Sequence, residues 1–248
     1  MGPFGGMIEM SEKKAIIEAF TDLAPRYEQV VDGELRRFWG WSYNGFIDNL
    51  IDMTPLKEDD IILDVATGTA VIPLKLANRG KTRGKIIGLD ITLAMLRRAA
   101  GKINDHAPAV PIRLTCASAM SMPYRKEHFD VILCGLATHH LDVPVVLAEM
   151  YRILKSGGRL TIADVGGSAE WRKPVWNFLI RAATFIYFLP KEGYARARSE
   201  AAALDNVYTG KEWHEQLTKT GFSNIKITRL PASHSWVPTP LVIRAERP

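Results

Sequence analysis

Asp64, Gly68 and Asp90 have the residue types and the spacing of a nucleoside-binding site. Gly68 can adopt a positive φ or let a ligand approach the backbone, and the amides of its turn offer donors to a polar ligand. Asp90 follows at a distance along the chain at which its carboxylate can accept both ribose hydroxyls of an adenosine. Asp64 lies within an apolar run, where its burial is costly unless it orients amides or a nearby cation.

These residues belong to a unit of strand, turn, helix and strand. The apolar run Ile61–Val65 is too short for a helix and predicts a buried parallel strand. Small residues follow over Ala66–Ala70, and apolar positions then recur at helical spacing over Val71–Ala77. A second apolar strand, Lys85–Leu89, ends directly before Asp90.

Two nucleotide-type cofactors suit such a unit. A dinucleotide site requires GxGxxG, whereas the chain reads AxGxA from Ala66 and has no third glycine at the required spacing. S-adenosylmethionine needs no pyrophosphate cradle, and the pattern DxAxGxA suits a ligand with an amino-acid end. We therefore favour S-adenosylmethionine, with a dinucleotide or a fold that binds neither as the alternatives.

The segments ILDVATGTA and IIGLDIT resemble the first and second motifs of class I S-adenosylmethionine-dependent methyltransferases, with alanines at two of the usual glycines. The turn LysSerGlyGlyArg is also similar, and the similarity extends from about Phe20 to Val165. The resemblance implies an α/β fold with a doubly wound, seven-stranded, mostly parallel Rossmann-like sheet, an antiparallel C-terminal strand and an N-terminal helical extension. It also implies that S-adenosylmethionine contacts Asp64, Ala66, Thr67 and Gly68, with Asp64 and Gly68 at its methionine end and Asp90 at its ribose.

FTDLAPRYEQV resembles the N-terminal signature of the ubiquinone/menaquinone C-methyltransferase branch, which implies that Tyr27 lies over the methionine end of the cofactor. An aromatic face or phenol oxygen favours a sulfonium cation, although Tyr27 could instead only pack within the N-terminal helix. Ile91 could lie on one face of the adenine. In this family an acidic side chain accepts from the adenine amino group, and Ser118 replaces that acid. The Ser118 hydroxyl can still accept, but more weakly than a charge, so adenine recognition should depend also on the Ala119 backbone and on packing of Met120.

His139 and His140 follow the predicted fourth strand, Phe129–Cys134. In a doubly wound sheet the ligand crevice opens at the carboxyl ends of strands one and four. Either imidazole could act there as a catalytic base, although adjacent side chains point in different directions and at least one should be structural. A metal site is not expected, because no carboxylate or cysteine falls at ligand spacing.

The apolar stretch Trp171–Pro190 predicts a helix that is too charged for a confident membrane span. It could be a lid over a hydrophobic substrate, a peripheral membrane or homodimer surface, or plain core. Arg196 and Arg198 could meet a phosphate or carboxylate of the substrate or simply face solvent. A helix at Lys211–Thr220 and two closing strands, Ile225–Leu230 and Leu241–Glu246, complete the chain.

The composition is that of one globular α/β domain: 248 residues, 47% hydrophobic, with a formal charge of +5 from scattered cations. We expect a helical cap over residues 1–55 and a methyltransferase domain over residues 56–248 with a helical lid insertion at about 168–209. The cap should contain a helix from Ser11 to Pro25 and a second helix reaching Met53. Cys116 and Cys134 are expected to be buried free thiols, which indicates a reducing cytoplasm. No pattern indicates a signal peptide or a nucleic-acid partner.

We therefore expect a cytoplasmic methyltransferase acting on a small, hydrophobic or lipid-like acceptor, with peripheral membrane association left open. The family resemblance implies C-methylation of a quinone precursor as the leading specific reaction. N- or O-methylation of another small metabolite or lipid head group remains an alternative. A methyltransferase fold with a non-methylating activity and a nucleotide-dependent oxidoreductase are the rival classes.

Overall fold

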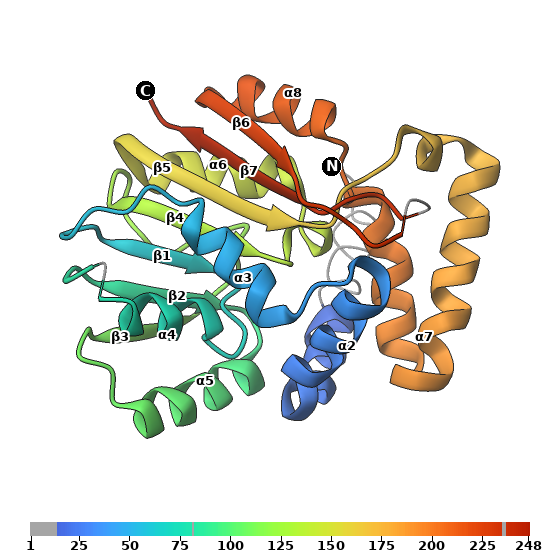
Figure 1. Ribbon diagram of the computed structural model, residues 1–248, viewed down its shortest axis with the longest axis horizontal. Helices are drawn as coiled ribbons and strands as arrows, with labels where there is room; N and C mark the ends of the chain where they lie inside the picture. The colour runs from blue at the N-terminus through green and yellow to red at the C-terminus, as the bar shows by residue number, and fades with distance from the viewer. Residues whose placement is uncertain (1–13, 81, 235–236) are drawn as a thin grey trace, which may run out of the picture.

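A seven-stranded sheet lies at the centre of the computed structural model, which describes residues 14–80, 82–234 and 237–248 (Figure 1). The strand order is β3-β2-β1-β4-β5-β7-β6, and β7 runs antiparallel to both of its neighbours, β5 and β6. This confirms the predicted doubly wound sheet and its antiparallel C-terminal strand. The strands are β1 Ile62–Val65, β2 Ile86–Asp90, β3 Ile112–Cys116, β4 Phe129–Gly135, β5 Leu154–Asp164, β6 Ser223–Arg229 and β7 Leu241–Glu246.

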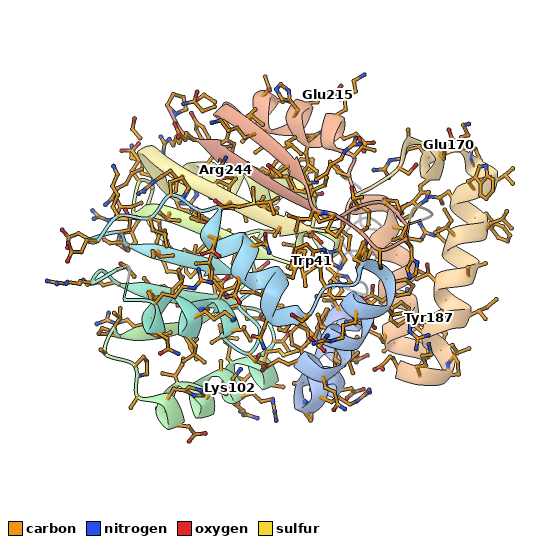
Figure 2. All side chains as sticks on the ribbon, in the orientation of Figure 1. Trp41, Lys102, Glu170, Tyr187, Glu215 and Arg244 are labelled. Atoms are coloured by element: carbon orange, nitrogen blue, oxygen red, sulfur yellow. The ribbon has the colours of Figure 1, made fainter. Side chains whose placement is uncertain are left out.

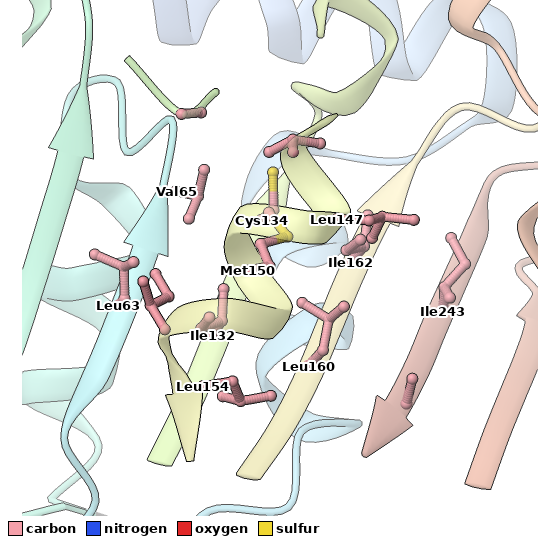
Figure 3. Packing of buried hydrophobic residues seen from close by; sticks show 14 of the residues in the cluster. Leu63, Val65, Ile132, Cys134, Leu147, Met150, Leu154, Leu160, Ile162 and Ile243 are labelled. Carbon is pink, nitrogen blue, oxygen red and sulfur yellow. The ribbon is translucent and has the colours of Figure 1, made fainter. Parts of the chain in front are cut away.

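Helices cover both faces of the sheet, with α3 and α4 on one side and α6 and α8 on the other (Figure 1). Side chains on a strand alternate between faces, so Ile62 packs toward α3 and α4 while Leu63 packs toward α6. Figure 3 shows the second of these cores, in which Ile132 and Cys134 of β4 meet Leu147 and Met150 of α6. The helices flanking the sheet are α3 Tyr43–Asp52, α4 Val71–Asn78, α5 Leu93–His106, α6 Val143–Ile153 and α8 Gly210–Thr220.

The N-terminal cap contains one more helix than the sequence predicted. Residues 14–23 are helical, and the expected start at Ser11 lies outside the described residues. Pro25 falls in a single 3-10 turn, η1 Ala24–Arg26, after which the chain continues as α2 Tyr27–Trp39. Proline fits the first turn of a helix, where its missing N–H is not needed, so it redirects the chain here without ending the helical segment.

Two local predictions were wrong. LysSerGlyGlyArg is not a turn that follows a helix: α6 stops at Ile153, and these residues bulge within β5, whose register passes from Leu154 directly to Arg159. Gly157 has a φ of 71°, which permits this bulge. Cys134 is buried as expected, whereas Cys116 is exposed because it ends the edge strand β3.

The insertion between β5 and α8 is a helical hairpin, not the single helix expected at Trp171–Pro190. It comprises η3 Ala169–Arg172, α7 Pro174–Ala203 and η4 Leu204–Asn206. Gly193 has φ 81° and ψ 177°, which breaks α7, and Figure 1 shows the chain reversing there. We call residues 174–192 the first arm and residues 194–203 the second arm. Among the described residues, no helix combines the length and apolar character needed to cross a membrane.

Candidate functional site

The turn after β1 adopts a tightly wound backbone. Ala66, Gly68 and Ala70 all have positive φ, at 57°, 54° and 61°. The Thr67 amide donates to the Leu89 carbonyl (2.9 Å), which fixes the turn against β2. The sequence placed Ala66, Thr67 and Gly68 in one turn, and the structure brings them together at the carboxyl ends of β1 and β2.

Asp90 lies beside this turn and is 8% exposed. Its carboxylate accepts hydrogen bonds from the backbone amides of Gly68 (2.9 Å) and Thr92 (2.8 Å). Burial raises the pKa of Asp90, while these two amides oppose the rise. Each carboxylate oxygen retains further acceptor capacity, so the arrangement fits a ligand that donates hydroxyl protons.

Asp64, at the end of β1, is fully buried, and neither carboxylate oxygen has a hydrogen-bond partner among the residues described. Burial raises its pKa to about 8, the nearby Thr67 side chain opposes the rise, and the charge of Asp90 adds to it. A buried carboxyl without a partner is costly, and a cationic ligand group would satisfy it. The orphaned carboxyl therefore fits the amino-acid end of S-adenosylmethionine.

Tyr27 begins α2 and covers the turn. Its ring carbon Cε1 lies 3.7 Å from the position that a Cβ on Gly68 would occupy, and its ring also contacts Phe20 and Tyr43. Burial raises the pKa of Tyr27 above its ordinary value, so the phenol is neutral. The geometry thus places Tyr27 over the turn and in a packed aromatic cluster at once.

Glu28 ties this cap to the turn and was not anticipated from the sequence. Its carboxylate accepts from the Thr69 hydroxyl and from the Lys102 ammonium, both at 2.7 Å. These bonds hold α2 against the turn and against α5.

The four residues expected near an adenine lie beside the end of β2. Ile91 follows Asp90 directly, and the Ala117 amide donates to the Asp90 carbonyl (3.0 Å), which places the loop after β3 alongside. Ser118 Oγ accepts from the Met120 amide (3.3 Å), and Ala119 is buried. The structure therefore groups Ile91, Ser118, Ala119 and Met120 next to Asp90, and their contact with adenine stays a prediction.

His139 forms a dyad with Asp164, a residue that sequence reasoning missed. His139 lies in the 3-10 turn η2 Thr138–His140, and its Nδ1 donates to Asp164 Oδ1 at 2.6 Å. Asp164 ends β5, is 1% exposed and also accepts from the Thr138 hydroxyl. Burial alone lowers the pKa of His139, but the charge and hydrogen bond of Asp164 outweigh burial and raise it. The bond occupies Nδ1 and leaves Nε2 for a ligand.

His140 has a different environment. Its Nε2 lies 3.3 Å from Glu200 on the second arm of α7, and its ring meets Phe20 edge-on. Burial, with the neighbouring charge of His139, lowers the pKa of His140. His140 thus connects η2 to α7, which favours a structural role for the second histidine.

The reason for dismissing a metal was wrong, because Glu200 supplies the carboxylate that the local sequence lacked. Ligand atoms of His139, His140 and Glu200 lie within 4.8 Å of one another. The guanidinium of Arg196, however, already pairs with Glu200, with Nη2 2.8 Å from Oε1. Arg196 thus already neutralises the Glu200 carboxylate that a metal ion would need as a ligand.

A cavity of about 750 Å³ has Tyr27 and His139 in its wall. Its walls come from α2, both arms of α7 and the loops after β4 and β5. Aromatic and aliphatic side chains dominate the walls, whereas Glu34, Arg196 and Glu200 form a polar end beside the histidines. Tyr27 lines the cavity and contacts the turn of Gly68, so it lies between the cavity and the turn.

Asp164, Glu34 and Glu200 join the site through tertiary structure that local sequence does not show. Asp164 carried the clearest signal, since it ends the strand adjacent to the one that precedes the histidines. Glu34 and Glu200 lie on helices whose polar faces resemble solvated surface in the sequence.

Comparisons with known proteins agree with this geometry. A family described as "Methyltransferase domain" matches residues 63–162. The demethylmenaquinone methyltransferase of Symbiobacterium thermophilum is 30% identical over 183 residues, covering 72% of this chain and 68% of the relative. The chain belongs to the class I S-adenosylmethionine-dependent methyltransferases. This methyltransferase is also similar to the demethylmenaquinone methyltransferase of Lactobacillus johnsonii, at 28% identity over 228 residues and 88% of each chain.

Among solved structures, the methyltransferase resembles geranyl diphosphate C-methyltransferase from Streptomyces coelicolor, with a TM-score of 0.65. The two share 16% sequence identity, and the match covers 90% of this chain and 84% of the other. The similarity confirms the fold. As a methyltransferase of this family the enzyme uses S-adenosylmethionine, for which Asp64, Gly68 and Asp90 offer the fitting groups described above.

Proposed function

We propose that this methyltransferase acts on an apolar, lipid-like acceptor held in the 750 Å³ cavity, with the His139–Asp164 dyad as the base. The observation that carries the proposal is the position of this dyad: His139 lines an apolar cavity that Tyr27 separates from the turn of Gly68. In this proposal, residues 1–55 act as a cap and residues 168–209 as a lid.

The dyad gives the proton of the acceptor a defined route. Bound S-adenosylmethionine supplies an electrophilic methyl group on a sulfonium. His139 Nε2 takes the proton from the attacking oxygen, nitrogen or carbon, and Asp164 stabilises the imidazolium that forms. The apolar walls exclude water, and the enclosed cavity restricts the orientation of the acceptor, which together account for much of the acceleration in an in-line displacement.

A quinone precursor methylated on carbon is the specific acceptor that we favour. Support comes from relatives named demethylmenaquinone methyltransferase and ubiquinone/menaquinone biosynthesis C-methyltransferase, at 28% and 26% identity. Support also comes from the aromatic cavity walls, which suit a ring with an apolar tail. O- or N-methylation of another small apolar metabolite is the alternative that the same cavity accommodates.

The outer face of the first arm suggests how a lipid-like acceptor arrives. One face of this arm lines the cavity through Trp176, Ile180 and Tyr187, the last of which is labelled in Figure 2. Tyr187 packs on Phe38 of α2, with ring centroids 5.6 Å apart. The opposite face exposes Phe178 and Ile186, which are 70% and 69% accessible. A helix that is apolar on both faces is suited to a lipid interface, so we propose peripheral membrane contact here.

The test is formation of S-adenosylhomocysteine across a panel of quinols, phenols and lipid amines. We expect turnover with a quinol, and at least about a 100-fold loss in kcat for His139→Asn, the range typical of a lost general base. Asp164→Asn should lower the pKa of His139 and move the acidic limb of the pH–rate profile to lower pH. His106→Asn, an exposed histidine on α5, is the control and should behave as wild type. An unaltered acidic limb in His139→Asn would return His139 to a structural role.

A further inference from the structure

Arg196 is a buried cation whose hydrogen-bonding capacity is only partly used. It lies on the second arm of α7, is 6% exposed and lines the cavity. Its Nη2 pairs with Glu200 at 2.8 Å, while Nε and Nη1 have no hydrogen-bond partner in the part of the chain that the structure describes. Buried guanidinium N–H groups are rarely left unpaired, because each loses its hydration without compensation.

The surroundings orient this guanidinium and limit what it can bind. It lies against the rings of Phe20 and Phe188, at 5.0 and 5.7 Å from their centroids. Glu200 pairs with it, and the Glu34 carboxyl lies 3.8 Å from the same Nη2. Two carboxyl groups thus face one cation, so this end of the cavity has no excess positive charge to hold a doubly charged phosphate.

We propose that Arg196 is a specificity-determining residue that binds a hydroxyl or carbonyl oxygen on the ring of the methyl acceptor. The proposal rests on the proposed function, because it assigns the occupant of the same cavity, and it narrows that occupant to an apolar ring bearing an uncharged or singly charged oxygen. The phosphate interpretation of Arg196 and Arg198 is thereby disfavoured. Arg198 is exposed and does not line the cavity.

Glu34 is a second group at the polar end of the cavity that can hydrogen-bond to an acceptor oxygen. Burial raises its pKa to about 7, with the Arg196 charge opposing and the Glu200 charge adding to the rise. In its neutral form Glu34 can donate a hydrogen bond as well as accept one. The polar end is continuous with the proposed base, since Glu200 contacts His140, whose ring centroid lies 4.2 Å from that of His139.

The test compares three probes of similar shape by calorimetry on the full chain saturated with S-adenosylhomocysteine: 2-naphthol, naphthalene and 2-naphthyl phosphate. We expect 2-naphthol to bind at least about tenfold more tightly than either of the others, the factor typical of a hydrogen bond to a charged group. Equal affinity for 2-naphthol and naphthalene in the wild-type protein would overturn the proposal, as would tighter binding of 2-naphthyl phosphate.

Variants then assign the preference to Arg196. The double variant Arg196→Met, Glu200→Gln removes the cation and its partner together and should abolish the preference for 2-naphthol while leaving naphthalene affinity unchanged. Arg196→Lys, which keeps the charge without the planar fork, should reduce the preference and serves if the double variant does not fold. The control Arg198→Met should retain the preference. A double variant that still prefers 2-naphthol would show that Arg196 is only structural.

The outcome is independent of the base assignment, because binding requires no turnover. A wild-type protein that prefers 2-naphthol but forms no S-adenosylhomocysteine with any quinol or phenol would contradict the proposed function and leave the oxygen-binding role standing. The reverse result, turnover without the preference, would contradict the role of Arg196 alone.

Discussion

Both carboxylate oxygens of Asp64 are fully buried without a hydrogen-bond partner in the described chain, next to the carboxylate of Asp90. The folded pKa of about 8 lies above the ordinary 3.8, so between these pH values the folded state retains a proton that the unfolded state has released. This carboxyl therefore weakens the protein without cofactor as the pH rises through that window. A carboxyl that destabilises the free protein is explained by a role in ligand binding, not by a role in stability.

We expect Asp64→Asn to separate stability from binding. At pH 8 and without cofactor, the free energy of unfolding should rise by about 1–3 kcal/mol, the scale of an unsatisfied buried polar group. Affinity for S-adenosylhomocysteine should fall at least about tenfold, because the ammonium group loses its counter-ion. Urea denaturation at pH 5 and pH 8, together with calorimetry, measures both changes.

Asp60→Asn is the matched control, because Asp60 is also buried but pairs with Arg159, with Oδ1 2.5 Å from Nη2. That variant should lose about 3–5 kcal/mol by leaving the buried Arg159 guanidinium without its carboxylate partner and should keep its cofactor affinity. Tight cofactor binding by Asp64→Asn would contradict the assignment of Asp64 to the amino-acid end.

At single positions, sequence reasoning found the residues that local motifs reveal. Asp64, Gly68 and Asp90 could be placed because two strand ends and one turn fix their relation within a short stretch. Asp164 and Glu200 could not, since each reaches the histidines only after the sheet has ordered and α7 has folded back. Residues of this kind are visible only in three dimensions.

Among the elements, the turn after β1 contains backbone strain that its sequence explains. Ala66 and Ala70 occupy the left-handed region at φ 57° and 61°, where a Cβ costs roughly 1–2 kcal/mol per residue relative to a right-handed conformation. The glycines usual in this family avoid that cost. The turn keeps this conformation with alanines because the packing of the segments on either side of it holds the backbone in place.

We expect Ala66→Gly to stabilise the protein by about 0.5–1 kcal/mol, since relief of the positive φ exceeds the entropy that glycine adds to the unfolded chain. Thermal unfolding and urea denaturation would measure the gain. Ala100→Gly, at an exposed position inside α5, provides the control and should lose about 1 kcal/mol. Equal losses in both variants would show that the turn bears no strain.

The elements themselves were largely predictable, and the exceptions share a cause. Buried strands and amphipathic helices follow from local periodicity, which placed β1, β2, β4, β6 and β7 to within a few residues. The break of α7 at Gly193 and the helix after Pro25 depend on where the flanking segments can pack. Local patterns cannot show whether a glycine or proline ends a helix or redirects it.

At the scale of the whole molecule, the cavity and the exposed apolar face lie on the two sides of one helix. The first arm of α7 supplies cavity-lining residues and, on its outer face, the exposed side chains of Val175, Phe178, Leu179 and Ile186. The chain has a formal charge of +5, so an anionic bilayer attracts it as a whole. An acceptor could thus pass from lipid to the cavity without crossing water.

We expect the wild-type protein to sediment with vesicles containing about 30% phosphatidylserine in phosphatidylcholine, because apolar burial and charge attraction act together on anionic lipid. The double variant Phe178→Asp, Ile186→Asp should lose at least about tenfold in vesicle affinity and keep its affinity for S-adenosylhomocysteine, since neither side chain lines the cavity. Val145→Asp introduces one such charge at an exposed apolar position on α6 and should bind vesicles nearly as wild type does. If Val145→Asp loses as much vesicle affinity as the double variant, net charge alone explains the attraction to the bilayer. If the double variant binds vesicles as wild type does and changes only its oligomeric state on gel filtration, the outer face of the first arm is instead an interface between two copies of the chain.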